Sequence, residues 1–512
     1  KFNDALLVFN NGSYLKSPTI TRKSKIETAL EKAIYSICPN LTIANDNKKA
    51  GQKKDFISIK SHITTVNQQE EKVKIKSGIV TIYDFPILYT PYISIPFPAS
   101  ERKSGFLIPS YSSTSNLGTG ILIPYYFNIA PNKDLTSTAQ IYPTSDNILL
   151  NNHYRHLLTN GYYETSLELA NNELDYSDVS GDVNMVDDNL RWQLMSEGDI
   201  ILSKNVGLEF DINNVGDKQY LEDYHNVFIN NTVSDITLDY IKEHKYYYIK
   251  TVRIQEIAND STKDAAPFAL PIINSYIESK PGIFNQKYSL LSNATILSRR
   301  DGLQYRRLSF KPALKVPYNL SGNLFEVEAN LQGDFYNLEN NYKNLSRDNN
   351  FNKNEFNYRP EVKLEWNLPL IKKVNSGSFV IEPMANIIYS SFDKNFNAIP
   401  DEDSKDTELT QSNLFLNDRF IGFDRNESGT RFNYGLRSAL YNNLGTFGFA
   451  IGQGYKKGNQ TQDVSIVGFN ESKSNFVGRF TYDATKIFNI AYNFQLNDSD
   501  YDNEINQIST SL

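Results

Sequence analysis

The dominant pattern along the chain is a strict alternation of apolar and polar residues. In the segment "FEVEANLQGDFY", residues 325–336, Val327 and Leu331 face one way, whereas Glu326 and Glu328 face the other. Alternation with this period is typical of a β-strand, and the segment is as long as a strand that crosses a bilayer, ~9–11 residues. The same pattern recurs at residues 206–212, 362–368, 447–451 and 488–496. The pattern therefore predicts an all-β chain with long strands.

Polar connections rich in Asn and Asp separate these strands, for example "NLENNYKNLSRDNNFNKNEFN" and "IPDEDSKDTELTQSN". Short turns alternate with long loops, as in an up-and-down barrel that has one short-loop rim and one long-loop rim. A soluble sandwich would use shorter strands of about 5–6 residues. We therefore predict a large antiparallel transmembrane β-barrel. Its apolar faces should point outward, and the polar faces that carry Glu326, Glu328, Lys363 and Glu365 should point inward.

The chain before residue 99 has a different pattern, because its strands are rich in Lys and closely spaced, as in a small soluble β-domain. Apolar residues on one strand face there should form an inward lining: Ile57, Ile59, Ile63, Val73, Ile75 and Ile79. One segment differs. In "SKIETALEKAIYSI", residues 24–37, the apolar positions recur at helical spacing, which predicts a helix.

Composition adds two exclusions. The net charge is -7 with both signs interspersed, so no basic field indicates nucleic-acid binding. No apolar stretch approaches the ~18 residues of a transmembrane helix. Hydrophobic residues make up 40% and aromatic residues 13% of the chain. These values fit either a wet, soluble β-protein or a transmembrane barrel, and composition alone does not separate the two.

Candidate chemistry is sparse. His153 and His156 lie three apart in a segment that reads as a strand, so they should face opposite sides and not share a metal. The acidic run "PDEDSKDTE", residues 400–408, lacks the ordered spacing and turn glycine of an EF-hand calcium loop, and we interpret it as a solvated loop. No nucleophile elbow, phosphate loop or zinc-binding helix is present. We therefore predict no catalytic residue, no metal site, no cofactor and no enzyme activity.

Three prolines fall where two consecutive strands are expected, in "ERKSGFLIPSYSSTSNLGTGILIPYYFNIAPNKDLT", residues 101–136. Proline cannot donate to a strand ladder and normally stays at strand edges, strand starts or bulges. Pro131 is typical of a turn between two strands. Pro109 and Pro124 are harder to place, and they suggest a sheet whose pairing is weakened at this point.

This region resembles the junction between periplasmic domain and barrel in the lipopolysaccharide-assembly outer-membrane proteins, the LptD/OstA family. The resemblance rests on three ordered segments: "FPILYTPYISIPFP", "RKSGFLIPSYSSTSNLG" and "IPYYFNIAPNKDLT". Two later segments, "IEPMANIIYS" and "DRFIGFDRNESGTRFNYGLRS", resemble further family landmarks in the same order. The resemblance does not cover residues 140–380 or those after 440, where only the strand pattern applies.

The resemblance implies that residues 1–98 are the C-terminal part of a periplasmic β-jellyroll and that residues 99–512 form an outer-membrane β-barrel of a Gram-negative bacterium. The closing strands of the barrel are expected to lie beyond the present sequence. The jellyroll would receive lipopolysaccharide from a periplasmic jellyroll bridge protein (LptA-like) and hold its acyl chains in the apolar lining named above. The barrel, plugged by a lipoprotein (LptE-like) and surrounded by outer-membrane lipids, would release the lipopolysaccharide sideways. No nucleic acid is implied.

Individual residues acquire roles through the same resemblance. Pro109 and Pro124 match the family's paired prolines beside the seam between the first and last strands, which implies a lateral gate. The alternative is that Pro109 merely ends one strand and Pro124 begins the next. Cys38 aligns with a jellyroll cysteine that pairs with a cysteine near the far C-terminus. It is therefore either half of a disulfide whose partner lies beyond residue 512, or a lone thiol.

Two other functions share parts of the pattern. A general outer-membrane porin would have the same strands but not the jellyroll-like start or the junction. A secreted β-rich adhesin or carbohydrate-binding protein would bury the apolar strand faces instead of exposing them. The direction in which those faces point separates the soluble alternative from the membrane barrel.

Overall fold

The computed structural model describes most of the chain. It covers residues 2–9, 13–36, 57–82, 84–96, 102–170, 175–177, 183–185, 190–217, 219–257, 266–341, 352–374, 377–391, 399, 401–405, 407–457, 466–470, 472–484 and 488–511. Cys38 lies outside the described residues, so the disulfide prediction stays a prediction. The chain forms two compact units. The first comprises residues 1–112, 120–141 and 150–155, and the second comprises residues 113–119, 142–149 and 156–512. Each unit is described by itself.

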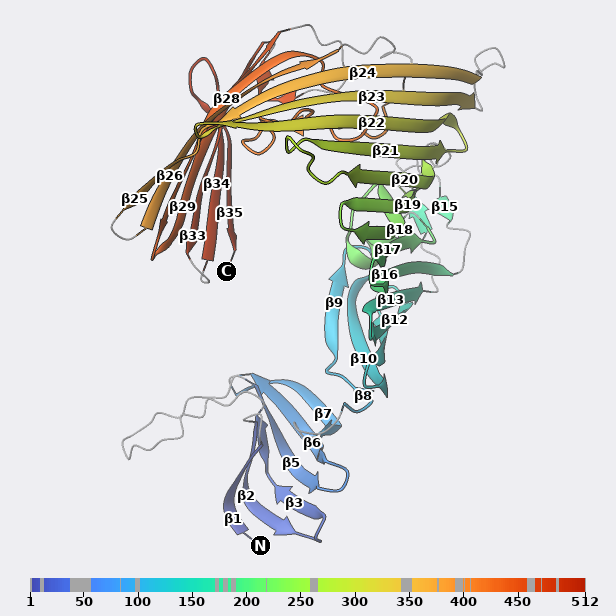
Figure 1. Ribbon diagram of the computed structural model, residues 1–512. Coiled ribbons are helices and arrows are strands. Elements are labelled where there is room, and N and C mark those ends of the chain that lie inside the picture. Colours follow the sequence, from blue (N-terminus) through green and yellow to red (C-terminus); the bar gives the residue numbers. More distant parts are fainter. Residues whose placement is uncertain are drawn as a thin grey trace. The chain divides into compact units, whose positions relative to one another are not determined.

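The first unit contains a small antiparallel sheet with strand order β1-β2-β3-β5-β6-β7, in which β4 pairs with both β2 and β5 (Figure 1). Its strands are β1 (Phe2–Val8), β2 (Tyr14–Arg22), β3 (Glu27–Glu31), β4 (Ile34–Ser36), β5 (Ile57–Asn67), β6 (Lys72–Ile82) and β7 (Phe85–Pro96). One face of this sheet buries an apolar core that includes Leu15, Leu30 and Ile75. Burial of this face is the main source of stability available to so small a sheet.

The predicted helix at residues 24–37 is wrong, because β3 and β4 occupy this segment. Lys32 adopts a left-handed backbone with φ of 52° between the two strands. This kink brings Leu30 and Ala33, three residues apart, into the same core. An interrupted strand has therefore produced the spacing of a helix.

The small sheet is followed by β8 (Gly105–Phe106), which belongs to the first unit, and by β10 (Gly118–Ala130) and β11 (Lys133–Tyr142). β10 pairs antiparallel with β8 and with β11. Like β9 (Ser110–Thr114) and β12 (Asn147–Leu158), β10 and β11 contribute residues to both units. The predicted domain boundary between residues 98 and 99 falls between β7 and β8, and it stays a prediction.

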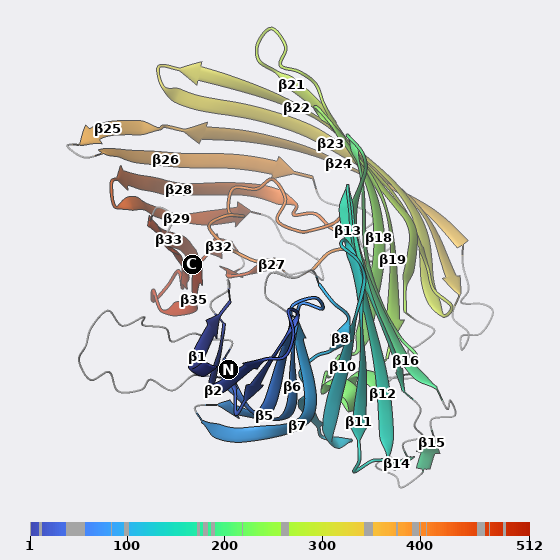
Figure 2. The ribbon, with the colours of Figure 1, turned by 90° about the horizontal axis from the view of Figure 1, so that it is seen from below.

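The second unit is dominated by one large antiparallel sheet whose strands pair in the order of the chain. The sheet is strongly curved, and its long strands β22, β23 and β24 run side by side (Figures 1 and 2). Its strands are β13 (Gly161–Ala170), β16 (Arg191–Ser203), β17 (Val206–Val215), β18 (Asn231–Lys242), β19 (Lys245–Glu256), β20 (Phe268–Glu278), β21 (Lys287–Ser298), β22 (Gly302–Leu320), β23 (Asn323–Asn341), β24 (Asn352–Asn367), β25 (Leu370–Val374), β26 (Gly377–Ser390), β28 (Gly429–Asn442), β29 (Gly445–Lys457), β31 (Phe469–Asn470), β32 (Lys473–Ser474), β33 (Phe476–Ala484), β34 (Phe488–Leu496) and β35 (Asn503–Ser511).

The remaining elements of the second unit are short and lie in the connections. β14 (Asp175–Ser177) pairs with β15 (Val183–Met185), β27 (Thr407–Glu408) pairs with β30 (Ile466–Val467), and α1 spans Tyr220–His225. Among the described residues, no helix has the length and apolar character needed to cross a membrane. The fold prediction, all-β with a large antiparallel sheet preceded by a small one, is confirmed.

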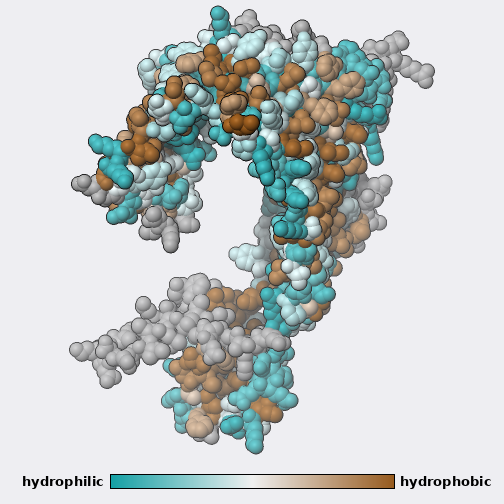
Figure 3. All heavy atoms as spheres, in the orientation of Figure 1, coloured by the Kyte–Doolittle hydropathy of each residue, from teal (hydrophilic) through white to brown (hydrophobic). Residues whose placement is uncertain are grey.

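The facing of the large sheet also follows the prediction. On β23, Val327 and Leu331 are 43% and 47% exposed, whereas Glu328 and Gln332 on the opposite face are 7% and 6% exposed. Lys363 on β24 is buried beside Glu328. In Figure 3, hydrophobic residues gather in a broad band over the large sheet, and hydrophilic residues lie along the edges of this band. A soluble sandwich would bury the apolar faces, so the large sheet has the polarity of a membrane barrel.

Candidate functional site

The prolines of the predicted gate interrupt the first strands of the large β-structure. Pro109 lies in the break between β8 and β9, and Pro124 lies inside β10. The alternative that Pro124 begins a strand is therefore wrong. The amide of Leu107 donates to the carbonyl of Pro124 at 2.9 Å. The gate prolines thus come from two neighbouring chain segments of the same unit.

The ladder between β8 and β10 lacks one backbone hydrogen bond because proline has no N–H. β8 and β10 pair Phe106 with Tyr125, and the next pair in this register is Leu107 with Pro124. Two residues of a hydrogen-bonded antiparallel pair normally exchange two N–H···O bonds. Only the bond from Leu107 to Pro124 can form, since Pro124 has no N–H to return. An unmade bond of this kind lowers the free energy needed to separate the two segments.

Large apolar side chains surround the weakened pairing. Phe106, Ile108 and Tyr111 are 74%, 69% and 82% exposed. The ring of Phe106 meets the ring of Tyr125 edge-on, with the ring centroids 4.9 Å apart. Exposed apolar groups of this kind favour contact with hydrocarbon over contact with water.

The apolar lining predicted for the small sheet is present only in part. Ile59, Val73 and Ile75 lie in its core and are 4%, 1% and 0% exposed, and Ile57 is half-buried. Ile63 and Ile79, however, are 42% and 41% exposed, so their assignment to the inward face is wrong.

The reason is a change of strand phase. Ser77 adopts a left-handed backbone with φ of 50°, and neither Ser77 nor His62 opposite it has a partner in the β5–β6 pairing, which resumes on both sides. Beyond this point Gly78 and Thr64 face inward, which turns Ile79 and Ile63 outward. One irregular residue on a strand exchanges its two faces, because strand side chains alternate with a period of two.

The sequence did not reveal the second prominent feature, a loop that covers the polar side of the large sheet. The described part of the connection between β26 and β28 binds strands far along the chain through buried ion pairs. Arg307 on β22 contacts Asp403 at 2.7 Å and Asp424 at 2.6 Å, and Arg359 on β24 donates to the carbonyl of Phe423 at 2.9 Å. Figure 2 shows this loop on the concave side of the sheet. The only signal for it in the sequence was the acidic run at 400–408, which we interpreted as a solvated loop.

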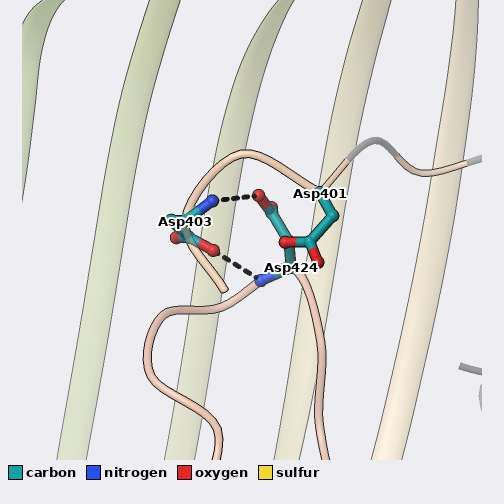
Figure 4. A group of neighbouring side chains, drawn as sticks. All are labelled: Asp401, Asp403 and Asp424. Atoms are coloured by element: carbon teal, nitrogen blue, oxygen red, sulfur yellow. Dashed lines mark hydrogen bonds between the residues drawn. The ribbon is translucent and has the colours of Figure 1, made fainter. Parts of the chain in front are cut away.

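Three carboxylates of this loop approach one another: Asp401, Asp403 and Asp424 (Figure 4). Protein donors already occupy them. Asp424 accepts bonds from Tyr336 and from the amide of Glu402, and Asp403 accepts bonds from the amides of Phe423 and Asp424. Arg307 supplies the compensating charge. The cluster is therefore part of the packing between loop and sheet, and the interpretation of a solvated loop is wrong for Asp401 and Asp403.

The fold and these features define a class: a large antiparallel β-structure with an apolar outer face, a polar inner face and a small β-domain before it, as in outer-membrane transport barrels. Comparison with known proteins identifies the family. The chain belongs to the LptD family: the family profile described as "LPS transport system D" matches residues 189–512, more than half of the chain. A second profile, "LptD protein", matches residues 76–297.

The curated relatives carry the same name. The "LPS-assembly protein LptD" of Escherichia coli (strain K12) and that of Shigella boydii serotype 4 (strain Sb227) are each 22% identical to the chain over 458 residues. The alignment covers 87% of this chain and 57% of each relative, so the chain spans little more than half the length of these proteins. The family is one of transport proteins of the Gram-negative outer membrane, in agreement with the predicted localisation and with the absence of an enzymatic role.

Proposed function

We propose that the protein takes up lipopolysaccharide on the periplasmic side and inserts it into the outer leaflet of the outer membrane through a lateral opening beside its first barrel strands. The observation that carries the proposal is the pairing of Leu107 with Pro124, which lacks one of its two bonds. In hydrocarbon, an unpaired backbone group costs several kcal/mol, so a ladder of this kind is tolerable where it is wet, covered by protein or meant to open.

The amphipathic cargo also needs a route for its acyl chains. The core of the small sheet, which includes Ile59, Val73 and Ile75, is the apolar surface proposed to receive them. The proposed partners are a periplasmic jellyroll bridge that delivers the lipid and a lipoprotein that plugs the barrel. Family membership supports both partners, and the polar inner face of the large sheet suits a protein plug better than lipid.

The proposal is tested by restoring the missing donor. Pro124→Ala supplies an N–H opposite the Leu107 carbonyl, and Pro109→Ala supplies a second donor. Each hydrogen bond contributes about 0.5–1.5 kcal/mol net. The bond restored at Pro124 alone therefore shifts an opening equilibrium by roughly twofold to tenfold, at about 1.4 kcal/mol per factor of ten. We expect the double variant of the complete protein to deliver less lipopolysaccharide to the cell surface at unchanged barrel abundance.

Pro131→Ala is the matched control, since Pro131 lies in the turn between β10 and β11 and outside both strands. Surface lipopolysaccharide is measured in cells that depend on the variant, together with the amount of folded barrel. Normal delivery by the double variant would remove the gate prolines from the mechanism.

A further inference from the structure

The tip of the first barrel hairpin, residues 113–119 between β9 and β10, does not project freely. A second loop, between β17 and β18, holds it. The side-chain amide of Asn116 donates to Asp223 of α1 at 2.5 Å. The amide of Ser115 donates to the side chain of Asn226 at 3.2 Å, and Asn226 in turn donates to the carbonyl of Ser113 at 3.3 Å. Two segments far apart in the sequence are thus joined by several hydrogen bonds.

Arg191 anchors the loop that holds the tip. The guanidinium of Arg191, at the start of β16, contacts Asp217 at 2.7 Å and Asp223 at 2.8 Å. The side chains of Arg191 and Asp223 are fully buried. Asp223 therefore joins Arg191, at the start of β16, to Asn116 on the hairpin tip.

An apolar core lies beneath these polar contacts. Leu117 of the hairpin tip is 1% exposed and packs with residues from several other chain segments. We call this group the rim cluster: Leu117, Tyr142, Leu149, Ala170, Val215, Tyr220, Leu221, Tyr224 and Ile257. Its members all come from connections at one end of the strands or from the strand residues next to them, so the cluster lies at one rim of the large sheet.

Further polar contacts fix α1 above the rim cluster. The hydroxyl of Tyr220 donates to Glu168 at 2.9 Å, and His225 contacts the same carboxylate oxygen at 2.7 Å. The amide of Asn147 donates to the hydroxyl of Tyr224 at 2.9 Å. Burial raises the pKa of Tyr224, so its hydroxyl stays protonated. The described connections after β11 and β17, the end of β13 and the hairpin tip therefore form one packed block.

We propose that Asn116, Asp223 and Arg191 are positioning residues for lateral release: they keep the tip of the first hairpin fixed to the rim while the strands part along another edge. The inference rests on the proposed function and adds to it which part of the gate stays still. The gate prolines weaken the pairing within the first hairpin. Without an anchor at its tip, this hairpin would detach instead of opening reversibly.

The inference is tested by locking the tip. Ser115→Cys and Asn226→Cys, whose parent side chains approach to 3.3 Å, are joined by a short bifunctional methanethiosulfonate in the complete protein. Each single-cysteine variant is the control for reagent effects and for links to Cys38. We expect the locked protein to deliver lipopolysaccharide at no less than half the rate of the unlocked one. A tenfold loss that a reducing agent restores would show that the tip must detach, and it would overturn the proposal.

A second variant frees the tip. Asn116→Ala removes the contact with Asp223 and leaves the Arg191–Asp217 pair intact. In the Ser115→Cys background, we expect maleimide to label the introduced thiol several-fold faster and delivery to fall several-fold at equal barrel abundance. Asn116→Ser, which keeps a donor, should recover part of both, and Lys204→Ala in an exposed turn should change neither. Unchanged labelling and delivery in Asn116→Ala would also overturn the proposal.

The two hypotheses fail in different ways. If cells that depend on the unmodified protein show no surface lipopolysaccharide, the proposed function is wrong. If the unmodified protein delivers lipopolysaccharide but the locked pair blocks delivery, only the fixed hairpin tip is wrong.

Discussion

The ion pairs of Glu427 show how single residues hold in place the inner loop, the described part of the connection between β26 and β28. Its carboxylate accepts hydrogen bonds from Arg419 and Arg431, both at 2.8 Å, and all three side chains are fully buried. Glu427→Gln removes the counter-ion that the two buried guanidinium groups share, and among the described residues only Arg431 keeps another carboxylate, Glu361 at 3.6 Å. Removing one partner from a buried ion pair costs about 3–5 kcal/mol. We therefore expect a clear loss of stability, measured as a lower denaturant midpoint of the complete barrel in detergent.

Glu408→Gln is the control for this measurement, since Glu408 lies in the same loop and is exposed. It should change the free energy of unfolding by no more than about 0.5 kcal/mol. If both variants unfolded at the same denaturant concentration, the buried carboxylate would not be what holds the loop to the sheet.

At the same scale, Ile63 and Ile79 mark the limit of what the sequence could predict. Alternation assigned them to the face of Ile59 and Ile75, and this would have held on regular strands. The left-handed backbone at Ser77 changes the phase of β6, and Ile63 turns outward with it on the neighbouring strand. A serine carries no signal for such a conformation, which is a tertiary property of two paired strands.

At the level of elements, β23 can be used to test which face of the large sheet meets lipid. Leu331 lies near the middle of this strand, on the exposed face. An arginine at the lipid-facing midplane costs about 2–4 kcal/mol. Leu331→Arg should therefore lower the free energy of unfolding from lipid vesicles by that amount. Gln332→Arg, one residue along on the buried polar face near Asp334, should cost less. Equal penalties for the two variants would mean that the faces of β23 are not distinguished by lipid.

The long strands of the large sheet were the most predictable part of the protein, because the alternation of apolar and polar residues persists along each strand and the outer face must be apolar in lipid. The segment 24–37 was misread because Lys32 breaks a strand and imitates helical spacing. The rim cluster and the inner loop were not predictable. Their contacts join residues such as Asn116 and Asp223, or Arg307 and Asp424, that are far apart in sequence. Local patterns do not encode pairings of that range.

At the scale of the whole molecule, the proposed route of the lipid begins in the small sheet. The core face of this sheet is expected to bind the lipid, and its exposed face serves as the control. Ile75 lies in the apolar core, whereas Ile79, four residues along the same strand, is exposed on the other face. A photo-crosslinking amino acid at Ile75 or Ile59 should capture lipopolysaccharide in cells making the complete protein, because acyl chains leave water only where the surface is apolar. The same group at Ile79 or Ile63 should capture little.

The measurement is the ratio of lipopolysaccharide adducts between the two faces at equal protein abundance. A ratio well above one favours the core face as the acyl-chain path. It would also show that the change of phase at Ser77 decides which isoleucines meet the cargo. Equal capture on both faces would mean that the lipid does not enter the small sheet, and its transfer to the barrel would then need another apolar surface, such as the exposed side chains of Phe106 and Ile108.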